Sequence, residues 1–92
     1  MRTLAEKFPE FLSDVGIKYV FGVPGGSWLD FMESMRKSDV DFVLTSNEAA
    51  AGFMAEGVHH VDGAPAILVG TVGPGVMNGV NVVANAMQDR VP

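Results

Sequence analysis

The chain has 92 residues, of which 48% are hydrophobic and none is cysteine. This length allows one small domain with a packed core, and the lack of cysteine excludes a disulfide scaffold and a thiolate metal site. The net charge of −5, from 11 acidic and 6 basic residues, argues against a nucleic-acid-binding protein, because such proteins rely on cationic contacts to phosphates.

The first residues show no apolar segment behind a basic start, so no signal peptide is predicted. The longest apolar run covers residues 64–69, which is the length of a strand and too short to span a bilayer. We therefore expect a cytoplasmic protein with no membrane partner.

A first helix is predicted over residues 4–15, where apolar side chains recur at helical spacing. Thr3 and Glu6 fit a capping box at its start. Pro9 conflicts with this start, because it removes a backbone hydrogen bond from a helix that has already begun. We expect either a kink at Pro9 or a helix that begins near it, and an end at Gly16.

Short strands and helices then alternate. In order, we expect a strand at 17–21, a helix from its cap Ser27 to about Lys37, a strand at 41–45, a helix at 47–61, a strand at 66–69 and a helix that opens at 73–75. The strand at 66–69 is continuously apolar, which is typical of a parallel sheet buried on both faces. This alternation predicts the α/β class, with a parallel sheet flanked by helices.

The last helix has two different faces. Its apolar face carries Val76, Val80, Val83, Ala84 and Met87, and an uncharged polar stripe opposite carries Asn78, Asn81, Asn85 and Gln88. The stripe fits ordinary solvent exposure, and its lack of charge also fits a polar protein interface.

Ligands of open α/β sheets bind outside the carboxyl ends of the strands. Residues 22–26, 45–48 and 70–75 occupy those ends here, and two of these segments are rich in glycine, which lets backbone approach a ligand closely. The first segment could also be a simple tight turn. The glycines of residues 73–79 suggest a dinucleotide loop, but their spacing is not G-x-G-x-x-G.

Glu48 is the one carboxylate among these segments, and its local sequence has two interpretations. Residues 45–48 (TSNE) fit a capping box in which Glu48 is the reciprocal partner, and a carboxylate also gains about 0.3–1 kcal/mol at the positive end of a helix. A catalytic role is the alternative. His59 and His60 are adjacent and lack the spacing of a helical metal pair, so no metal site is predicted.

Four segments together resemble one family. They are residues 20–26 (VFGVPGG), 46–55 (SNEAAAGFMA), 71–79 (TVGPGVMNG) and 84–92 (ANAMQDRVP). In order and spacing, they resemble the N-terminal pyrimidine-binding domain of acetolactate-synthase-like enzymes that depend on thiamine diphosphate (ThDP). Many relatives have histidine where Asn47 stands, and several have threonine where Met77 stands.

The resemblance implies a ThDP-binding fold of which residues 1–92 contain only the first three strands and their helices. It implies that Glu48 is catalytic and hydrogen-bonds the ring nitrogen of the aminopyrimidine. The imino tautomer favoured in this way deprotonates the thiazolium carbon, and the ylid attacks a 2-oxoacid substrate. The implied cofactor-binding residues are Pro24, Gly25, Glu48, Thr71, Gly73 and Asn78.

The family pattern also implies partners that the sequence does not contain. Mg²⁺ is held by a diphosphate-binding domain absent from this chain, and the cofactor lies between subunits of a homo-oligomer, a dimer or tetramer. The resulting hypothesis is the N-terminal part of a ThDP-dependent decarboxylase or carboligase, a lyase or transferase, inactive alone. A non-catalytic interaction module with the same fold is the alternative, and a dinucleotide-binding enzyme comes third.

Overall fold

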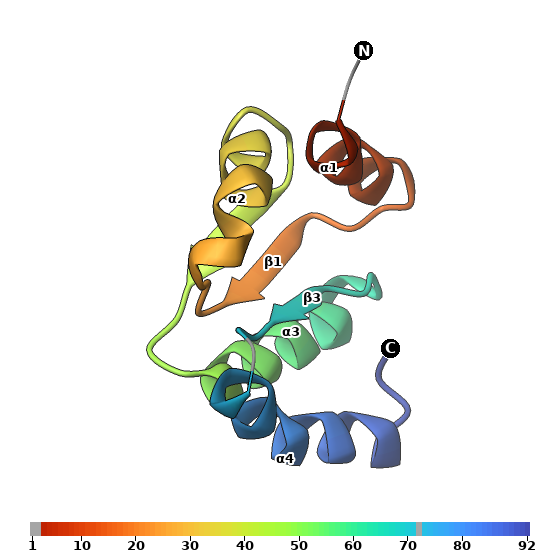
Figure 1. Cartoon of the computed structure of the whole chain (residues 1–92). Coiled ribbons are helices and arrows are strands. Elements are labelled where there is room, and N and C mark those ends of the chain that lie inside the picture. Colours follow the sequence, from red (N-terminus) through yellow and green to blue (C-terminus); the bar gives the residue numbers. More distant parts are fainter. Residues whose placement is uncertain (1–2, 72) are drawn as a thin grey trace.

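The computed structural model describes residues 3–71 and 73–92, which form a three-stranded parallel sheet between two layers of helices (Figure 1). In chain order the elements are α1 (Leu4–Asp14), β1 (Tyr19–Gly22), the 3-10 helix η1 (Gly26–Trp28), α2 (Leu29–Arg36), β2 (Asp41–Leu44), α3 (Glu48–Asp62), β3 (Ile67–Val69) and α4 (Pro74–Gln88). The predicted α/β class and the order of elements are confirmed, and most predicted boundaries are within two residues.

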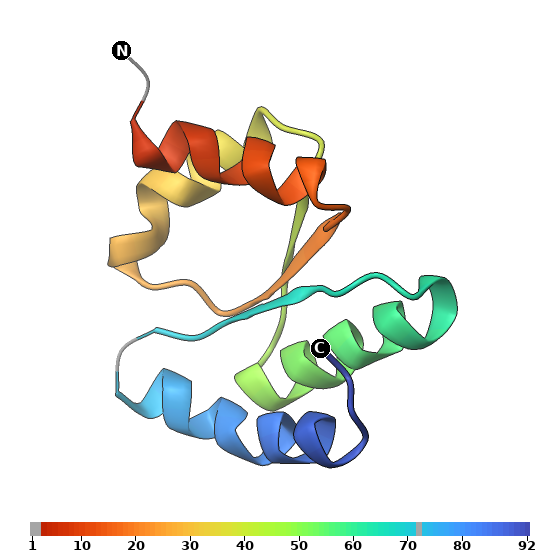
Figure 2. The same ribbon diagram turned by 90° about the vertical axis from the view of Figure 1, so that its right-hand side faces the viewer.

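The strand order is β2-β1-β3, so β1 is central. Tyr19 of β1 lies opposite Asp41 of β2, and Val20 lies opposite Ile67 of β3. Helices α1 and α2 pack together on one face of the sheet, and α3 and α4 pack together on the other (Figure 2). Strands β2 and β3 lie on opposite sides of β1, so the connection between them, which contains α3, passes over β1.

The main core lies between the sheet and the α1–α2 layer. Its buried members are Leu12, Val20, Met35, Val40 and Val69. Phe8 and Phe31 close this layer with an edge-to-face contact, their ring centroids 5.6 Å apart. This core fixes β1 and β3, whose carboxyl ends carry the glycine-rich loops.

Helix α1 begins at Leu4, as the predicted capping box requires. Thr3 Oγ1 accepts a hydrogen bond from the Glu6 backbone N–H at 3.3 Å, and Glu6 Oε1 accepts one from the Thr3 N–H at 3.2 Å. The helix continues through Pro9, so the alternative start near Pro9 is wrong. Pro9 is buried, and its packing offsets the hydrogen bond that it cannot donate.

The predicted start of α2 is also wrong. Ser27 lies inside η1, and the N-cap position of α2 is Trp28, whose side chain makes no capping hydrogen bond. The loop after β1 therefore tightens into a 3-10 turn before the α-helix begins.

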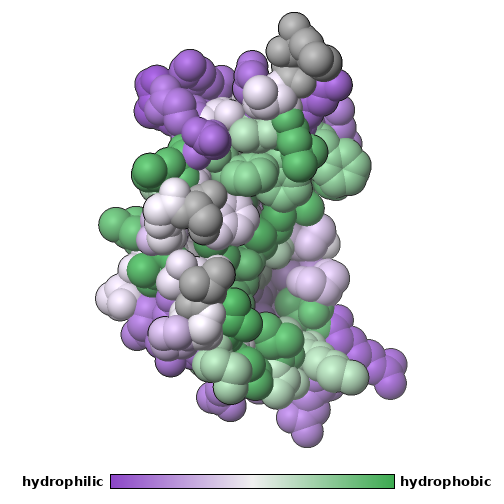
Figure 3. All heavy atoms as spheres, in the orientation of Figure 1, coloured by the Kyte–Doolittle hydropathy of each residue, from purple (hydrophilic) through white to green (hydrophobic). Residues whose placement is uncertain are grey.

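Helix α4 presents a different face to the protein than its apolar pattern predicts. Val82, outside the predicted apolar face, is 1% exposed, whereas the predicted face is at least half exposed at Val80, Val83 and Met87. In Figure 3, hydrophobic side chains gather across the middle of the face seen in Figure 1, with hydrophilic ones mainly at its ends. The predicted core face of α4 is thus an uncovered apolar surface in this chain.

Candidate functional site

The three predicted loop segments meet at one edge of the sheet. All three strands are parallel and end at Gly22, Leu44 and Val69, so residues 22–26, 45–48 and 70–75 follow their carboxyl ends. The connection from β1 to β2 contains α2, and the connection from β2 to β3 contains α3 and lies on the opposite face of the sheet. The strands β2 and β3 are thus added on opposite sides of β1, and the direction of the strand order reverses between β1 and β3. This is the switch point at which open α/β sheets bind ligands.

Glu48 is the first residue of α3, and it does not act as a cap. Asn47 takes that role, because its Oδ1 accepts a hydrogen bond from the Ala50 N–H at 2.8 Å. Thr45, the predicted cap, instead donates its hydroxyl to the Asn47 carbonyl at 2.9 Å. The capping-box interpretation of Glu48 is therefore wrong: the residue stands two positions too early in the helix to reach back to the cap.

The Glu48 side chain is turned into the protein and is 5% exposed. Asn78 of α4 donates its Nδ2–H to Glu48 Oε1 at 3.3 Å, across 30 residues of sequence. Among the described residues, no hydrogen bond to Oε2 is found. The positive end of α3 favours a carboxylate at this position. The site thus holds a carboxylate in which Asn78 fixes Oε1, while Oε2 is available to accept a hydrogen bond.

Glu48 borders a cavity of about 430 Å³ that is otherwise apolar. Its wall includes Trp28 from η1, Val69 and Gly70 from the end of β3, and Gly75 and Gly79 from α4. A β-carbon built on Gly75 would lie 3.3 Å from Glu48 Oε2 and 2.8 Å from Thr71 Cγ2, so any side chain at this position would crowd the carboxylate. Sequence reasoning missed Trp28 and Gly75 as site residues, although Gly75 lies in the motif that pointed to the site.

The other predicted cofactor residues are not among the described residues that line this cavity, although Thr71 and Asn78 lie beside residues that are. Gly25 packs on Thr71, because a β-carbon at Gly25 would overlap Thr71 Oγ1. Thr71 in turn touches the Gly75 position, which links the first loop to Glu48. Pro24 is half-buried beside Gly25. Gly73 is exposed and has a φ of 69°, so its role is to turn the chain into α4, and Val72 of the same motif lies outside the described residues.

A comparison with known families bears on this arrangement. The family described as "Thiamine pyrophosphate enzyme, N-terminal TPP binding domain" matches residues 2–92. The chain belongs to this family. The recognised resemblance to its acetolactate-synthase-like members is confirmed as well.

Three relatives of this TPP-binding domain show its range. The acetolactate synthase isozyme 1 large subunit of Escherichia coli is 40% identical over 91 residues, which are 98% of this chain and 16% of that protein. The mitochondrial acetolactate synthase catalytic subunit of Saccharomyces cerevisiae is 40% identical over 86 residues, 92% of this chain and 12% of that protein. A probable 2-ketoarginine decarboxylase of Pseudomonas aeruginosa is 36% identical over 90 residues, 98% and 16%. The chain thus spans about one sixth or less of these relatives.

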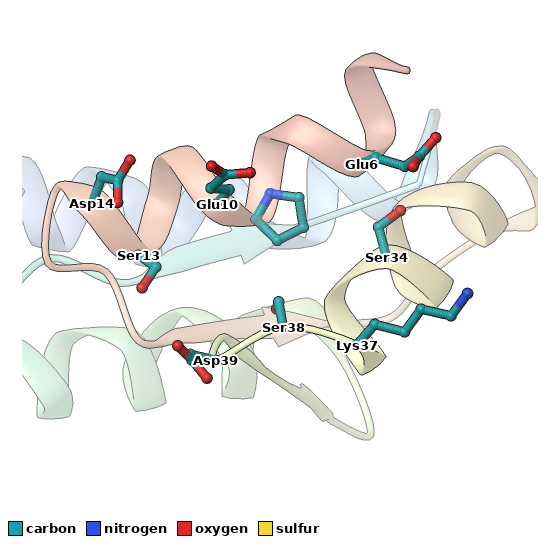
Figure 4. Close-up of a pocket in the computed structure, with 9 residues that line it drawn as sticks. Glu6, Glu10, Ser13, Asp14, Ser34, Lys37, Ser38 and Asp39 are labelled. Carbon is teal, nitrogen blue, oxygen red and sulfur yellow. The ribbon is translucent and has the colours of Figure 1, made fainter. Parts of the chain in front are cut away.

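A second hollow of this TPP-binding domain, also about 430 Å³, lies between α1 and the end of α2, away from Glu48. Figure 4 shows polar and charged side chains along it, among them Glu10, Asp14 and Asp39.

Within residues 3–71 and 73–92, no group of three or more His, Cys, Asp or Glu side chains could hold a metal ion. No helix in the same part of the chain is long and apolar enough to cross a membrane.

Proposed function

We propose that this chain binds the aminopyrimidine ring of ThDP in the Glu48 cavity and activates the cofactor through Glu48. The observation that carries the proposal is a single buried carboxylate in an apolar cavity at the switch point of the sheet. The family match supports the choice of ThDP over a dinucleotide.

The residues present suit an aminopyrimidine. This ring is flat and aromatic with a polar edge, so it needs apolar walls and one well-placed hydrogen-bonding group. The cavity offers walls from Trp28, Val69 and Val83, and Glu48 Oε2 as the polar group. The glycine at position 75 leaves room beside that oxygen.

The proposed role of the chain is to hold and move one proton. Glu48 shares a proton with the ring nitrogen through Oε2, and the surrounding apolar wall keeps water from competing for that hydrogen bond. Asn78 holds the second oxygen, so that the carboxyl group keeps one orientation. The cofactor itself, once bound, supplies the nucleophilic carbon and the electron sink for 2-oxoacid chemistry.

The remaining proposals concern the whole protein. We propose a 2-oxoacid substrate, a decarboxylase or carboligase reaction of the lyase or transferase kind, and residues 1–92 as part of a larger pyrimidine-binding domain. Mg²⁺ and the diphosphate are proposed to bind elsewhere, in a diphosphate-binding domain of a homo-oligomer. Support comes from the names of the relatives and from the small share of their length that the chain covers.

Titration of the ¹⁵N-labelled chain with thiamine diphosphate tests the binding step. The chain has one tryptophan, so the indole N–H of Trp28 is a single, easily assigned reporter in the cavity. We expect shifts at Trp28, Glu48 and Gly75, and none with NADH at the same concentration. Shifts confined to the hollow between α1 and α2, or caused only by NADH, would contradict the proposal.

A second candidate function rests on the uncovered apolar surface of α4. Val76, Met77, Val80, Val83 and Met87 are each half or more exposed, which is unusual for one face of a helix in an isolated domain. An interaction module would associate through this surface rather than through the amide stripe, because Asn78 and Asn85 of the stripe are bonded to α3.

Light scattering tests this second function. The module predicts an oligomer that Met87→Lys dissociates and that does not respond to ThDP. Val61→Lys, at an equally exposed position on α3, is the matched control and should leave the oligomer intact. A monomeric parent chain would rule the module out.

A further inference from the structure

Two buried carboxylates lie on one stripe of α3, and an asparagine of α4 serves each of them. Glu48 is 5% exposed and Glu56 is 8% exposed. Asn78 donates to Glu48, and Asn85 Nδ2 lies 3.1 Å and 3.2 Å from the two oxygens of Glu56. Residues seven or eight positions apart share a helix face, so the two pairs lie along the same seam.

A close steric contact sits between the two pairs. A β-carbon at Gly52 would overlap Cγ1 of Val82, so Val82 occupies a notch that only glycine leaves open. The contacting positions are 48 of α3 with 78 of α4, then 52 with 82, and then 56 with 85, so the numbers rise along both helices. The two helices therefore run in the same direction, and three successive contacts define how far along α3 the helix α4 lies.

The surroundings of Glu56 are mainly apolar. It borders a largely apolar groove of about 400 Å³ with Ala55, Ala66, Leu68, Ala86 and Met87. Its described hydrogen-bond partner is Asn85, whose Nδ2 also lies 3.5 Å from Asp89 Oδ2. A well-packed hydrophobic residue serves stability at least as well as a buried charge. A buried polar pair does, however, discriminate between alternative alignments of two helices, which is its best-attested use.

We propose that Glu56 and Asn85 are positioning residues, whose pair fixes the register of α4 on α3 and thereby places the Asn78 amide on Glu48. One residue of slip moves a helix by about 1.5 Å, which exceeds the distance range of a hydrogen bond. The Asn78–Glu48 hydrogen bond therefore depends on the register of α4 on α3. At 3.3 Å, this single hydrogen bond is too weak to fix that register by itself. The inference rests on the proposed function only in the role given to Glu48.

The side-chain amide of Asn78 reports this register directly by NMR, without any cofactor or turnover. The Glu48→Ala variant supplies the reference position of an unpaired Asn78 amide. We expect Glu56→Ala and Asn85→Ala each to move the Asn78 signal at least half of the way to that reference. The conservative Glu56→Gln keeps an acceptor for Asn85 and should leave the signal in place, as should Asn81→Ala on the exposed side of α4.

An unchanged Asn78 signal in folded Glu56→Ala and Asn85→Ala variants would overturn the proposal. If the alanine variants do not fold, Asn85→Asp provides the same test, because it keeps the size of the side chain while it removes the donor. The signal is then expected to move, and a signal within a tenth of its original position would overturn the proposal.

The outcome is separable from that of the proposed function. Should Glu48→Gln abolish turnover while the Glu56 and Asn85 variants leave Asn78 in place, this inference fails and the proposed function stands. Should the variants displace Asn78 while Glu48→Gln retains turnover, the register role stands and the catalytic role of Glu48 fails.

Discussion

The side-chain nitrogen of Asn78 lies 3.3 Å from Oε1 of Glu48, and these residues begin the contact between α4 and α3 at the switch point of the sheet. The contact joins two loop motifs that are far apart in sequence. Glu48 also borders an apolar cavity, and its other oxygen lies beside the Gly75 position.

Removal of the Asn78 amide takes away the side-chain donor that the described residues provide to the buried Glu48 carboxylate. The Asn78→Ala variant is therefore expected to lower the free energy of unfolding by about 1–3 kcal/mol. Urea denaturation followed by circular dichroism measures this change. Asn81→Ala, on the exposed side of the same helix, should stay within about 0.5 kcal/mol of the parent. Equal effects of the two variants would argue against the Asn78–Glu48 bond.

The notch at Gly52 predicts a strong contrast between two glycines of α3. Gly52→Ala places a methyl group against the buried Val82 and should destabilise the protein by about 1–3 kcal/mol. At Gly57 the added methyl group meets open space, so Gly57→Ala should stabilise the protein by about 0.5–1 kcal/mol. Thermal unfolding of both variants checks the prediction, which fails if they shift the midpoint in the same direction.

Gly75 tests the cavity without a change in any charged group. A methyl group here crowds Thr71 and Glu48 Oε2, so Gly75→Ala should weaken binding of thiamine diphosphate at least about tenfold, or about 1.4 kcal/mol. Isothermal titration calorimetry measures the affinity. Gly26→Ala is the control, because nothing lies within 4 Å of the added methyl group. Unaltered binding by the Gly75 variant would place the ligand elsewhere.

The sequence predicted the features of this protein that depend on local patterns. The alternation of apolar segments predicted a parallel sheet, and the strand boundaries predicted that the segments at 22–26 and 70–75 follow the carboxyl ends of its strands. Thr3 and Glu6 predicted their capping box, which depends only on neighbours in sequence. Each of these features depends on residues that are close together in the sequence.

Features set by packing between helices could not be predicted. Periodicity shows that α4 has an apolar face, but not that Val82 would face α3 while Val80 and Val83 stay uncovered. The Glu56–Asn85 pair depends on the alignment of two helices and leaves no local signature. The role of Glu48 was ambiguous because a two-position shift of the N-cap, from Thr45 to Asn47, decides whether Glu48 can complete a capping box.

Turnover of a Glu48→Gln variant tests the proposed role of Glu48 most directly. Residues 2–92 can replace the matching segment of the Escherichia coli acetolactate synthase isozyme 1 large subunit, which is 40% identical to this chain. Glu48→Gln is expected to lower kcat for acetolactate formation about 100-fold or more while ThDP still binds. Glu33→Gln, at an exposed position on α2, should leave kcat unchanged. Near-parental turnover by the Glu48 variant would contradict the assignment of Glu48 as the activating residue.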